Sequence, residues 1–155
     1  NNMLHYVKGN ILNSLCKALI NPVNCQGVMG AGLAKEFKLA YPEMYENYKV
    51  ECENKTLGPG GFYCFQDETG KLIICLATKN KWKEPSKMAW IEQGLATLGW
   101  WITYQRIHSI AIPAIGCGLG GLDWDEVKQK IEETHEKHWK SILVEVYVPE
   151  GHEIK

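Results

Sequence analysis

Apolar positions along the chain follow two spacings, and these predict strands and helices in alternation. Short apolar runs between turn residues are typical of buried strands; they occupy residues 4–7, 18–20, 62–66, 72–77, 109–113 and 142–148. Apolar residues that recur every three or four positions are typical of helices; they occupy 33–39, 42–53, 86–102 and 124–139. Strands joined by helical crossovers predict a three-layer α/β/α sandwich with a mixed, mostly parallel sheet. We expect a single domain over residues 1–155.

Turn and capping residues mark the element boundaries. Pro42 suits the first turn of a helix, where its missing N–H has no partner in any case. Glu68-Thr69-Gly70 predicts a short hairpin between two strands. Ser86 is expected to cap the long helix that follows it. Asp123 and Glu126 have the spacing of a capping box, with Asp123 at the capping position.

Composition restricts the class of protein. A chain of 155 residues that is 45% hydrophobic can bury a core without disulfides or a structural metal. It carries 17 basic and 18 acidic residues, so its net charge of -1 argues against a protein that coats nucleic acid through bulk attraction. No apolar run approaches the roughly 20 residues that span a bilayer. We therefore expect a packed domain with no membrane segment.

The six cysteines form no Cys-x-x-Cys pair, so neither disulfides nor zinc are predicted. Reduced thiols are the default of a cytoplasmic protein, which is the expected location. His135 and His138 lie three apart on a charged helix and are read as surface or packing residues. Cys117 lies between two glycines, with no histidine or acid placed to activate it, and is read as a small buried side chain.

Two glycine-rich loops, 27–32 and 116–121, each follow a strand and precede a helix. Glycine lets another group approach the backbone closely, and backbone N–H groups at a helix N-terminus bind anions. Two such loops in the same topological position favour a diphosphate site. Neither loop ends in the Gly-Lys-Ser or Gly-Lys-Thr of a P-loop, and Lys35 stands where a dinucleotide fingerprint needs glycine. Spacing alone does not identify the nucleotide.

The sequence resembles the macro domain family over essentially its whole length. The motifs that carry the resemblance, in the family's order, are KGNI (8–11), NPVN (21–24), GVMGAGLA (27–34) and IPAIGCGLGGL (112–122). Macro domains bind ADP-ribose in a cleft on a mixed sheet. Three further motifs resemble DNA ADP-ribosyl glycohydrolase antitoxins of the DarG type: VMG (28–30), TKNKWKEPS (78–86) and GLDW (121–124). The second of these is also similar to terminal ADP-ribose protein glycohydrolase.

The resemblance implies a set of ligand-binding residues. Asn10 stands where the family usually has an Asp that accepts from adenine, so weaker adenine recognition is expected. Ile11 packs near the base or belongs to the core. Asn24 faces the distal ribose, while Asn21 supports the strand end or bonds the loop backbone. The residues expected to hold the diphosphate and distal ribose are Gly27, Val28, Met29, Gly30, Ala31, Gly32, Pro113, Gly116, Cys117, Gly118, Leu119 and Gly120.

Lys79 is the implied catalytic residue. A partly desolvated lysine near other cations can act as a nucleophile. Its amine would attack the anomeric carbon of the distal ribose or assist departure of the modified group; the other reading is a solvated loop lysine. The protein-directed relative has an Asp where this chain has Gly120, so no general acid or base is identified. Helix capping accounts for Asp123.

Trp82, between Lys81 and Lys83, is a candidate contact for single-stranded DNA, because an aromatic ring flanked by cations suits a base and its phosphates. Packing against the following helix is the alternative. The window 79–87 holds four lysines against one acid. The remaining tryptophans considered are expected to pack; they are Trp90, Trp100, Trp101 and Trp124.

The leading hypothesis is an ADP-ribosyl hydrolase that removes ADP-ribose from thymidine in DNA. The alternatives are a binding module without turnover, a hydrolase acting on ADP-ribosylated protein or O-acetyl-ADP-ribose, and a partner-binding domain of a larger antitoxin. The expected partners are ADP-ribose or ADP-ribosylated DNA and a cognate ADP-ribosyltransferase toxin. We expect a monomer without a cofactor or a metal.

Overall fold

A six-stranded sheet runs through the middle of the protein in a computed structural model, which describes residues 3–154. Its spatial order is β1-β6-β5-β2-β4-β3, and all neighbouring strands are parallel except β3 and β4. The strands are β1 Leu4–Val7, β2 Ala18–Val23, β3 Phe62–Gln66, β4 Leu72–Ala77, β5 Ser109–Pro113 and β6 Leu143–Tyr147. The predicted mixed, mostly parallel sheet is confirmed.

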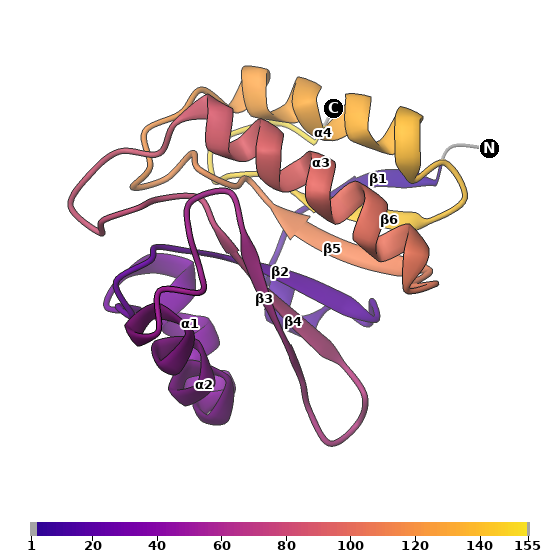
Figure 1. The fold of residues 1–155 in the computed structure, drawn as a ribbon. Coiled ribbons are helices and arrows are strands. Elements are labelled where there is room, and N and C mark those ends of the chain that lie inside the picture. Colours follow the sequence, from indigo (N-terminus) through magenta and orange to yellow (C-terminus); the bar gives the residue numbers. More distant parts are fainter. Residues whose placement is uncertain (1–2, 155) are drawn as a thin grey trace.

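Two pairs of helices cover the two faces of the sheet (Figure 1). One face packs on α1 (Gly32–Ala40) and α2 (Pro42–Glu53), the other on α3 (Met88–Tyr104) and α4 (Trp124–His138). Because strand side chains alternate between faces, each side of the sheet contributes to its own core. The three-layer sandwich is thereby confirmed. A short 3-10 helix, η1 (Ile11–Asn13), was not predicted.

The helix boundaries follow the predicted capping residues in two of three cases. Pro42 begins α2, and the Asp123 side chain accepts the Glu126 N–H at 3.2 Å at the start of α4. The prediction for Ser86 is wrong, because α3 begins at Met88 and has no side-chain cap. Ser86 is instead buried, and its backbone N–H bonds the Gly120 carbonyl at 2.9 Å.

The sheet opens at one end, between its two central strands. β2 pairs with β4 over all of its residues, but with β5 only at Ala18 and Leu19. Beyond Leu19, β2 and β5 diverge toward their carboxyl ends. Pro22 lies in the diverging half, where β2 has one partner strand and a missing N–H is tolerated. The divergence separates the two glycine-rich loops, which follow β2 and β5.

The tryptophans fall into two groups. Trp124 is buried, and Trp101 packs on Phe62 with ring centroids 4.9 Å apart, as predicted. The prediction for Trp100 is wrong, because its side chain is 61% exposed and stacks on Tyr104 of the next helical turn. The buried face of α3 carries Ile91, and Trp100 is not among the buried residues of this helix.

All six cysteines are free thiols. Within residues 3–154, no three metal-ligating side chains gather in one place. No helix in the same span is both long and apolar enough to cross a bilayer.

Candidate active site

A cleft of about 700 Å³ occupies the place where β2 and β5 diverge. It brings together both glycine-rich loops, the segment after β4 and the segment after β6. Fifteen of the predicted site residues line it: Ile11, Asn24, Val28, Met29, Gly30, Ala31, Gly32, Lys79, Trp82, Pro113, Gly116, Cys117, Gly118, Leu119 and Gly120. Five do not line it: Asn10, Asn21, Gly27, Lys81 and Lys83.

Three of these five residues shape the structure behind the cleft. The Asn10 side chain accepts the Leu12 N–H at 3.0 Å and caps η1. Asn21 is fully buried, and its Nδ2 faces the sulfur atoms of Met29 and Cys75 rather than the loop backbone, which was the alternative to its supporting the strand end. Gly27 has a φ of 80° and lies against Lys49 of α2.

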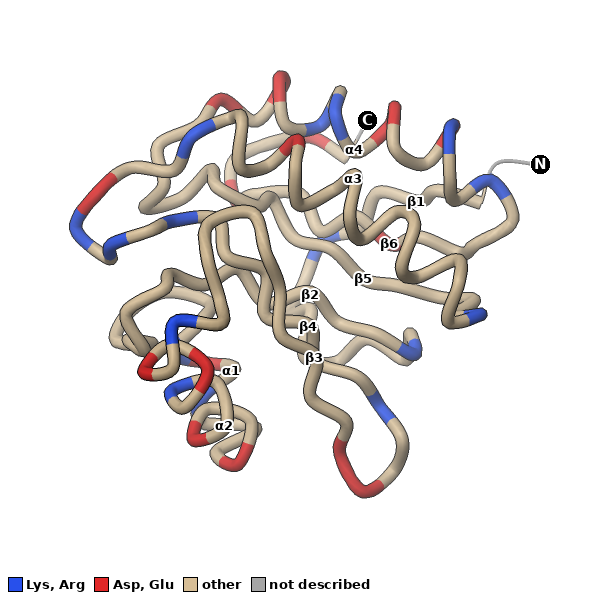
Figure 2. The backbone as a smooth tube through the Cα atoms, in the orientation of Figure 1, with Lys and Arg blue, Asp and Glu red and all other residues tan. Residues whose placement is uncertain are grey.

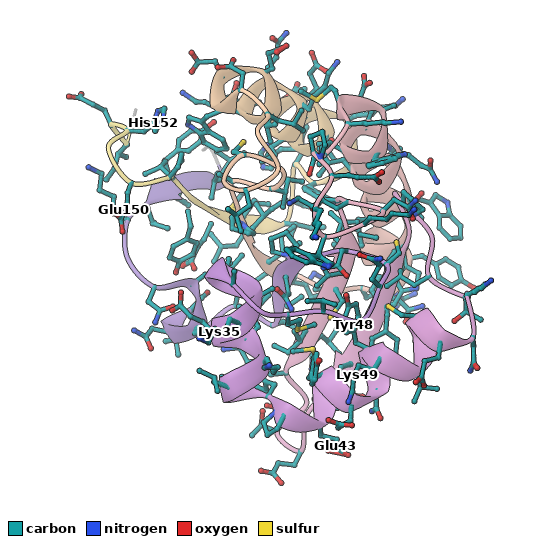
Figure 3. The ribbon with its side chains drawn as sticks, turned by 90° about the vertical axis from the view of Figure 1, so that its left-hand side faces the viewer. Lys35, Glu43, Tyr48, Lys49, Glu150 and His152 are labelled. Carbon is teal, nitrogen blue, oxygen red and sulfur yellow. The ribbon has the colours of Figure 1, made fainter. Side chains whose placement is uncertain are left out.

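The first glycine-rich loop is held by Asn24 and by a tyrosine that sequence reasoning missed. Asn24 Oδ1 accepts the Gln26 N–H at 2.9 Å, and its Nδ2 donates to the Val28 carbonyl at 2.8 Å. The hydroxyl of Tyr48, on α2 (Figure 3), lies 2.7 Å from the Asn24 carbonyl and 2.9 Å from Oδ1. Burial raises the pKa of Tyr48 far above its ordinary value, which keeps the hydroxyl a donor. Asn24 therefore fixes the loop backbone.

The second loop requires glycine at three positions, because Gly116 and Gly121 have a positive φ and Gly120 leaves no room for a Cβ. Gly116 has a φ of 76°, in the left-handed region that favours glycine. A Cβ on Gly120 would lie 2.5 Å from the Gly116 carbonyl oxygen, closer than real contacts allow. The turn closes through the Leu122 N–H, which donates to the same carbonyl at 2.9 Å. This close backbone packing sets the wall of the cleft.

Unpaired backbone donors belong to both loops. Among the described residues, no acceptor is found for the N–H groups of 29–31 in the first loop or of 118–120 in the second. All six residues line the cleft, and α1 begins directly after the first set. Backbone donors at a helix N-terminus suit an anion, and two sets suit a diphosphate.

Lys79 projects from the segment after β4 and is half-buried in the cleft. Its amine donates to the Trp82 carbonyl at 3.2 Å. Two bonds fasten the segment to the residues just before the first glycine-rich loop: the Cys25 N–H donates to the Asn80 carbonyl at 2.9 Å, and the Trp82 N–H donates to Gln26 Oε1 at 2.8 Å. These bonds fix the position of the Lys79 amine relative to the backbone that leads into the first glycine-rich loop.

Trp82 is 49% exposed and lines the cleft. The Lys83 amine lies 5.1 Å from its ring centroid. Lys81 and Lys83 are exposed. The segment between β4 and α3 that carries them projects from the body of the protein and includes several basic residues (Figure 2). The exposed ring and its cationic neighbours form a surface continuous with the cleft.

Other residues of the cleft had no signal in the sequence. One part of the cleft is lined by the last residue of β6, Tyr147, and by the segment that follows it, up to Glu150. Ser86 also lines the cleft and has a buried hydroxyl. Cys117, one of the predicted residues, also lines the cleft. Burial raises the pKa of its thiol to about 12, and the charge of Asp123 makes a smaller contribution. This agrees with its interpretation as a non-nucleophilic side chain.

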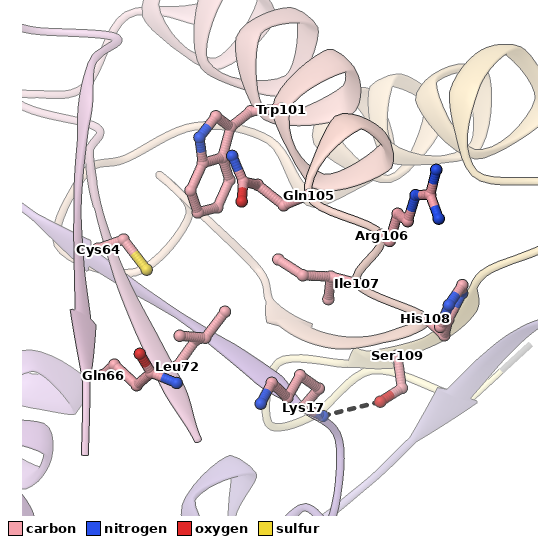
Figure 4. A pocket seen from close by; sticks show the side chains of 10 residues that line it. All are labelled: Lys17, Cys64, Gln66, Leu72, Trp101, Gln105, Arg106, Ile107, His108 and Ser109. Carbon is pink, nitrogen blue, oxygen red and sulfur yellow. Dashed lines mark hydrogen bonds between the residues drawn. The ribbon is translucent and has the colours of Figure 1, made fainter. Parts of the chain in front are cut away.

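A second cavity, of about 560 Å³, lies at the other end of the sheet (Figure 4). It is lined by Lys17, just before β2, and by Ser109, the first residue of β5, whose Oγ accepts the Lys17 N–H at 2.7 Å. The ring of Trp101 forms part of its wall. None of the predicted site residues lines this cavity, so the chemistry is assigned to the cleft.

Comparison with known proteins supports this assignment. The family model described as "Macro domain" matches residues 20–131. A DNA ADP-ribosyl glycohydrolase of Thermus aquaticus is 41% identical over 152 residues, covering 95% of this chain and 41% of that protein. One from Mycobacterium tuberculosis is 38% identical over 154 residues, covering 96% and 43%. The chain thus spans less than half the length of these relatives.

Solved structures agree with the sequence relatives. The macrodomain of Mycobacterium tuberculosis DarG matches with a TM-score of 0.92 and 37% identity, covering 96% of this chain and 99% of that one. Thermosipho africanus DarTG in complex with ADP-ribose matches with a TM-score of 0.90 and 32% identity, covering 98% of this chain and 43% of that one. With its fold, its loops and these matches in agreement, the chain belongs to the macro domain family.

Proposed function

We propose that this protein binds ADP-ribose in the cleft and removes it from thymidine in DNA. The observation that carries the proposal is the Lys79 amine, which lies in a cleft lined by two sets of unpaired backbone donors. The proposal draws further support from relatives named DNA ADP-ribosyl glycohydrolase and from a similar protein solved with ADP-ribose.

The cleft offers a place for each part of the ligand. The donors of residues 29–31 and 118–120 hold the diphosphate. Ile11 and the segment after β6 receive the adenine, since the Asn10 side chain is engaged in capping η1. The distal ribose then lies toward Asn24 and Lys79, on the side where the first loop and the segment after β4 are bonded together.

Lys79 acts at the anomeric carbon of the distal ribose. In the covalent route, the neutral amine attacks this carbon and the bond to the thymine nitrogen breaks. The base leaves with the bonding electron pair and takes up a proton. Water then hydrolyses the lysine adduct, which releases ADP-ribose and restores the amine. In the alternative route, the ammonium assists departure of the base while water attacks.

We further propose that the exposed ring of Trp82 stacks on a base next to the modified nucleotide, with Lys81 and Lys83 near its phosphates. Stacking on an aromatic ring tolerates any base, and neighbouring cations follow the strand. Such a local surface is compatible with a net charge of -1, because the cleft supplies most of the affinity.

Release of ADP-ribose from an oligonucleotide with one ADP-ribosylated thymidine tests the proposal. We expect wild-type protein to release it and Lys79→Ala to stop release while its Kd for ADP-ribose stays within about threefold. Lys137→Ala, on the exposed side of α4, serves as the control. Undiminished release by Lys79→Ala would contradict the role of the lysine.

The same assay separates the alternatives. Release from ADP-ribosylated protein or O-acetyl-ADP-ribose, but not from DNA, would identify a hydrolase of another substrate class. Tight binding of ADP-ribose without release from any substrate would identify a binding module.

A partner enzyme follows from the proposed substrate, since an ADP-ribosyltransferase must first modify the DNA. A Thermosipho africanus relative, 34% identical over 142 residues that cover 80% of this chain and 37% of that protein, is a "DNA ADP-ribosyl transferase-DNA ADP-ribosyl glycohydrolase fusion protein". We propose a cognate transferase for this protein. Co-elution of the two proteins in size-exclusion chromatography would show whether they also bind each other.

A further inference from the structure

Ser86 carries a buried hydroxyl that no protein group satisfies. The residue is only 5% exposed, and its Oγ has no hydrogen-bond partner within residues 3–154. It lines the same cleft as Lys79. Leaving a buried hydroxyl unpaired is unfavourable, so such a group in a cleft calls for a functional explanation.

The hydroxyl stands where the second loop has no side chain of its own. The Ser86 N–H donates to the Gly120 carbonyl at 2.9 Å, which binds the two segments together. A Cβ built on Gly120 would lie 2.4 Å from Ser86 Oγ. The hydroxyl therefore occupies the space in which a side chain at position 120 would begin, and glycine at 120 is what makes room for it.

We propose that Ser86 Oγ is a substrate-binding group that hydrogen-bonds a hydroxyl of the distal ribose; this rests on the proposed function. Ser86 lies on the connection between β4 and α3 that also carries Lys79, whereas the adenine end is formed by Ile11 and the segment after β6. A serine hydroxyl both donates and accepts, so it pairs with a ribose hydroxyl in either sense. No base is bonded to it, so it positions the sugar and transfers no proton.

The proposal makes stability and binding respond in opposite ways to one substitution. Ser86→Ala removes a hydroxyl that has no bond to lose in the free protein, so the melting temperature is expected to stay unchanged or rise. The affinity for ADP-ribose is expected to fall about tenfold, because a ribose hydroxyl loses its partner.

Ser14 offers a matched control. It is 4% exposed, and its Oγ donates to Glu145 Oε1 at 2.6 Å and accepts the Cys16 N–H at 3.1 Å. Ser14→Ala should lower the melting temperature and leave ADP-ribose affinity within about twofold. The two variants thus separate a satisfied buried serine from an unsatisfied one.

Calorimetry with ADP-ribose and with ADP locates the contact, because ADP lacks the distal ribose. Ser86→Ala should weaken binding of ADP-ribose only. Equal weakening for ADP, unchanged affinity for ADP-ribose, or a melting temperature lowered as in Ser14→Ala would each overturn the proposal. If wild-type protein binds ADP-ribose but does not release it from DNA, the proposed reaction is refuted. The role of Ser86 in binding is then still decided by the calorimetry with ADP-ribose and ADP.

Discussion

Gln26 and Lys79 are connected through a single residue, Trp82. The Trp82 N–H donates to Gln26 Oε1 at 2.8 Å, and the Trp82 carbonyl accepts from the Lys79 amine at 3.2 Å. Gln26 is itself fixed by its N–H bond to Asn24 Oδ1. Asn24 and Gln26, which lead into the first glycine-rich loop, therefore set the position of the amine on the neighbouring segment.

Gln26→Ala should lower the turnover of ADP-ribosylated DNA about fivefold, while the Kd for ADP-ribose changes less than threefold. The lost hydrogen bond is exposed and is worth about 1 kcal/mol, enough to loosen the segment that carries the amine. Single-turnover release and calorimetry measure the two effects. Gln129→Ala, which removes an exposed bond to Glu133 on α4, should change neither. Wild-type turnover by Gln26→Ala would show that this bond does not position the lysine.

Gly120→Ala should disrupt the second glycine-rich loop. The new Cβ would meet the Gly116 carbonyl oxygen at 2.5 Å, and a backbone atom cannot move aside without shifting the turn. We expect a loss of about 1–3 kcal/mol in the free energy of unfolding and more than tenfold weaker ADP-ribose binding. Gly58→Ala is the matched control, because nothing lies within 4 Å of its Cβ. Equal stability of the two variants in urea denaturation would refute the clash.

Tyr48→Phe should destabilise the first glycine-rich loop from behind. The hydroxyl is buried and lies within bonding distance of two oxygens of Asn24. Its removal leaves these acceptors short of a donor, at a cost of about 1–3 kcal/mol in the free energy of unfolding. Tyr45→Phe removes one bond of a half-buried ring to Gly27, at 3.1 Å, and should cost less. A larger loss for Tyr45→Phe in urea denaturation would contradict this ranking.

The thiols should react slowly with iodoacetamide in the folded protein. Burial is the largest cause of a raised pKa for each of the six cysteines; for Cys117 the pKa rises to about 12, and for Cys25 and Cys64 to about 11. At pH 8 the reactive thiolate is therefore scarce. Mass spectrometry should find six labels only after unfolding. Rapid labelling of Cys117 with loss of ADP-ribose release would instead indicate a nucleophilic thiol.

Local patterns predicted most of the fold, because strands, turns and caps depend on near neighbours. The apolar runs located the strands, and Asp123 was recognised from its spacing to Glu126. The capping prediction failed for Ser86 because this residue lies before the first turn of α3, where its N–H bonds the carbonyl of Gly120, 34 residues further along the chain. Trp100 failed because an apolar side chain alone does not indicate burial. It lies outside the three-and-four spacing of the apolar residues that α3 buries, which are Ile91, Leu95, Leu98 and Ile102.

The cleft was only partly predictable for a similar reason. Glycine-rich loops and the Thr78-Lys79 segment are contiguous motifs that a sequence displays. Tyr48 and Gln26 act through partners 24 and 56 residues away, and neither has a local pattern that marks it. The divergence of β2 and β5 depends on strand order, which hydrophobic spacing does not encode.

The cleft takes its walls from five segments, spread from Gly9 to Glu150. These segments come from both ends of the chain, so the site exists only once they have been brought together on the sheet. A ligand held there discriminates between the complete fold and any partly folded form. Each tenfold excess of ADP-ribose over its Kd would then add about 1.4 kcal/mol to the free energy of unfolding. The proposed product would thus stabilise the assembled sheet relative to partly folded forms.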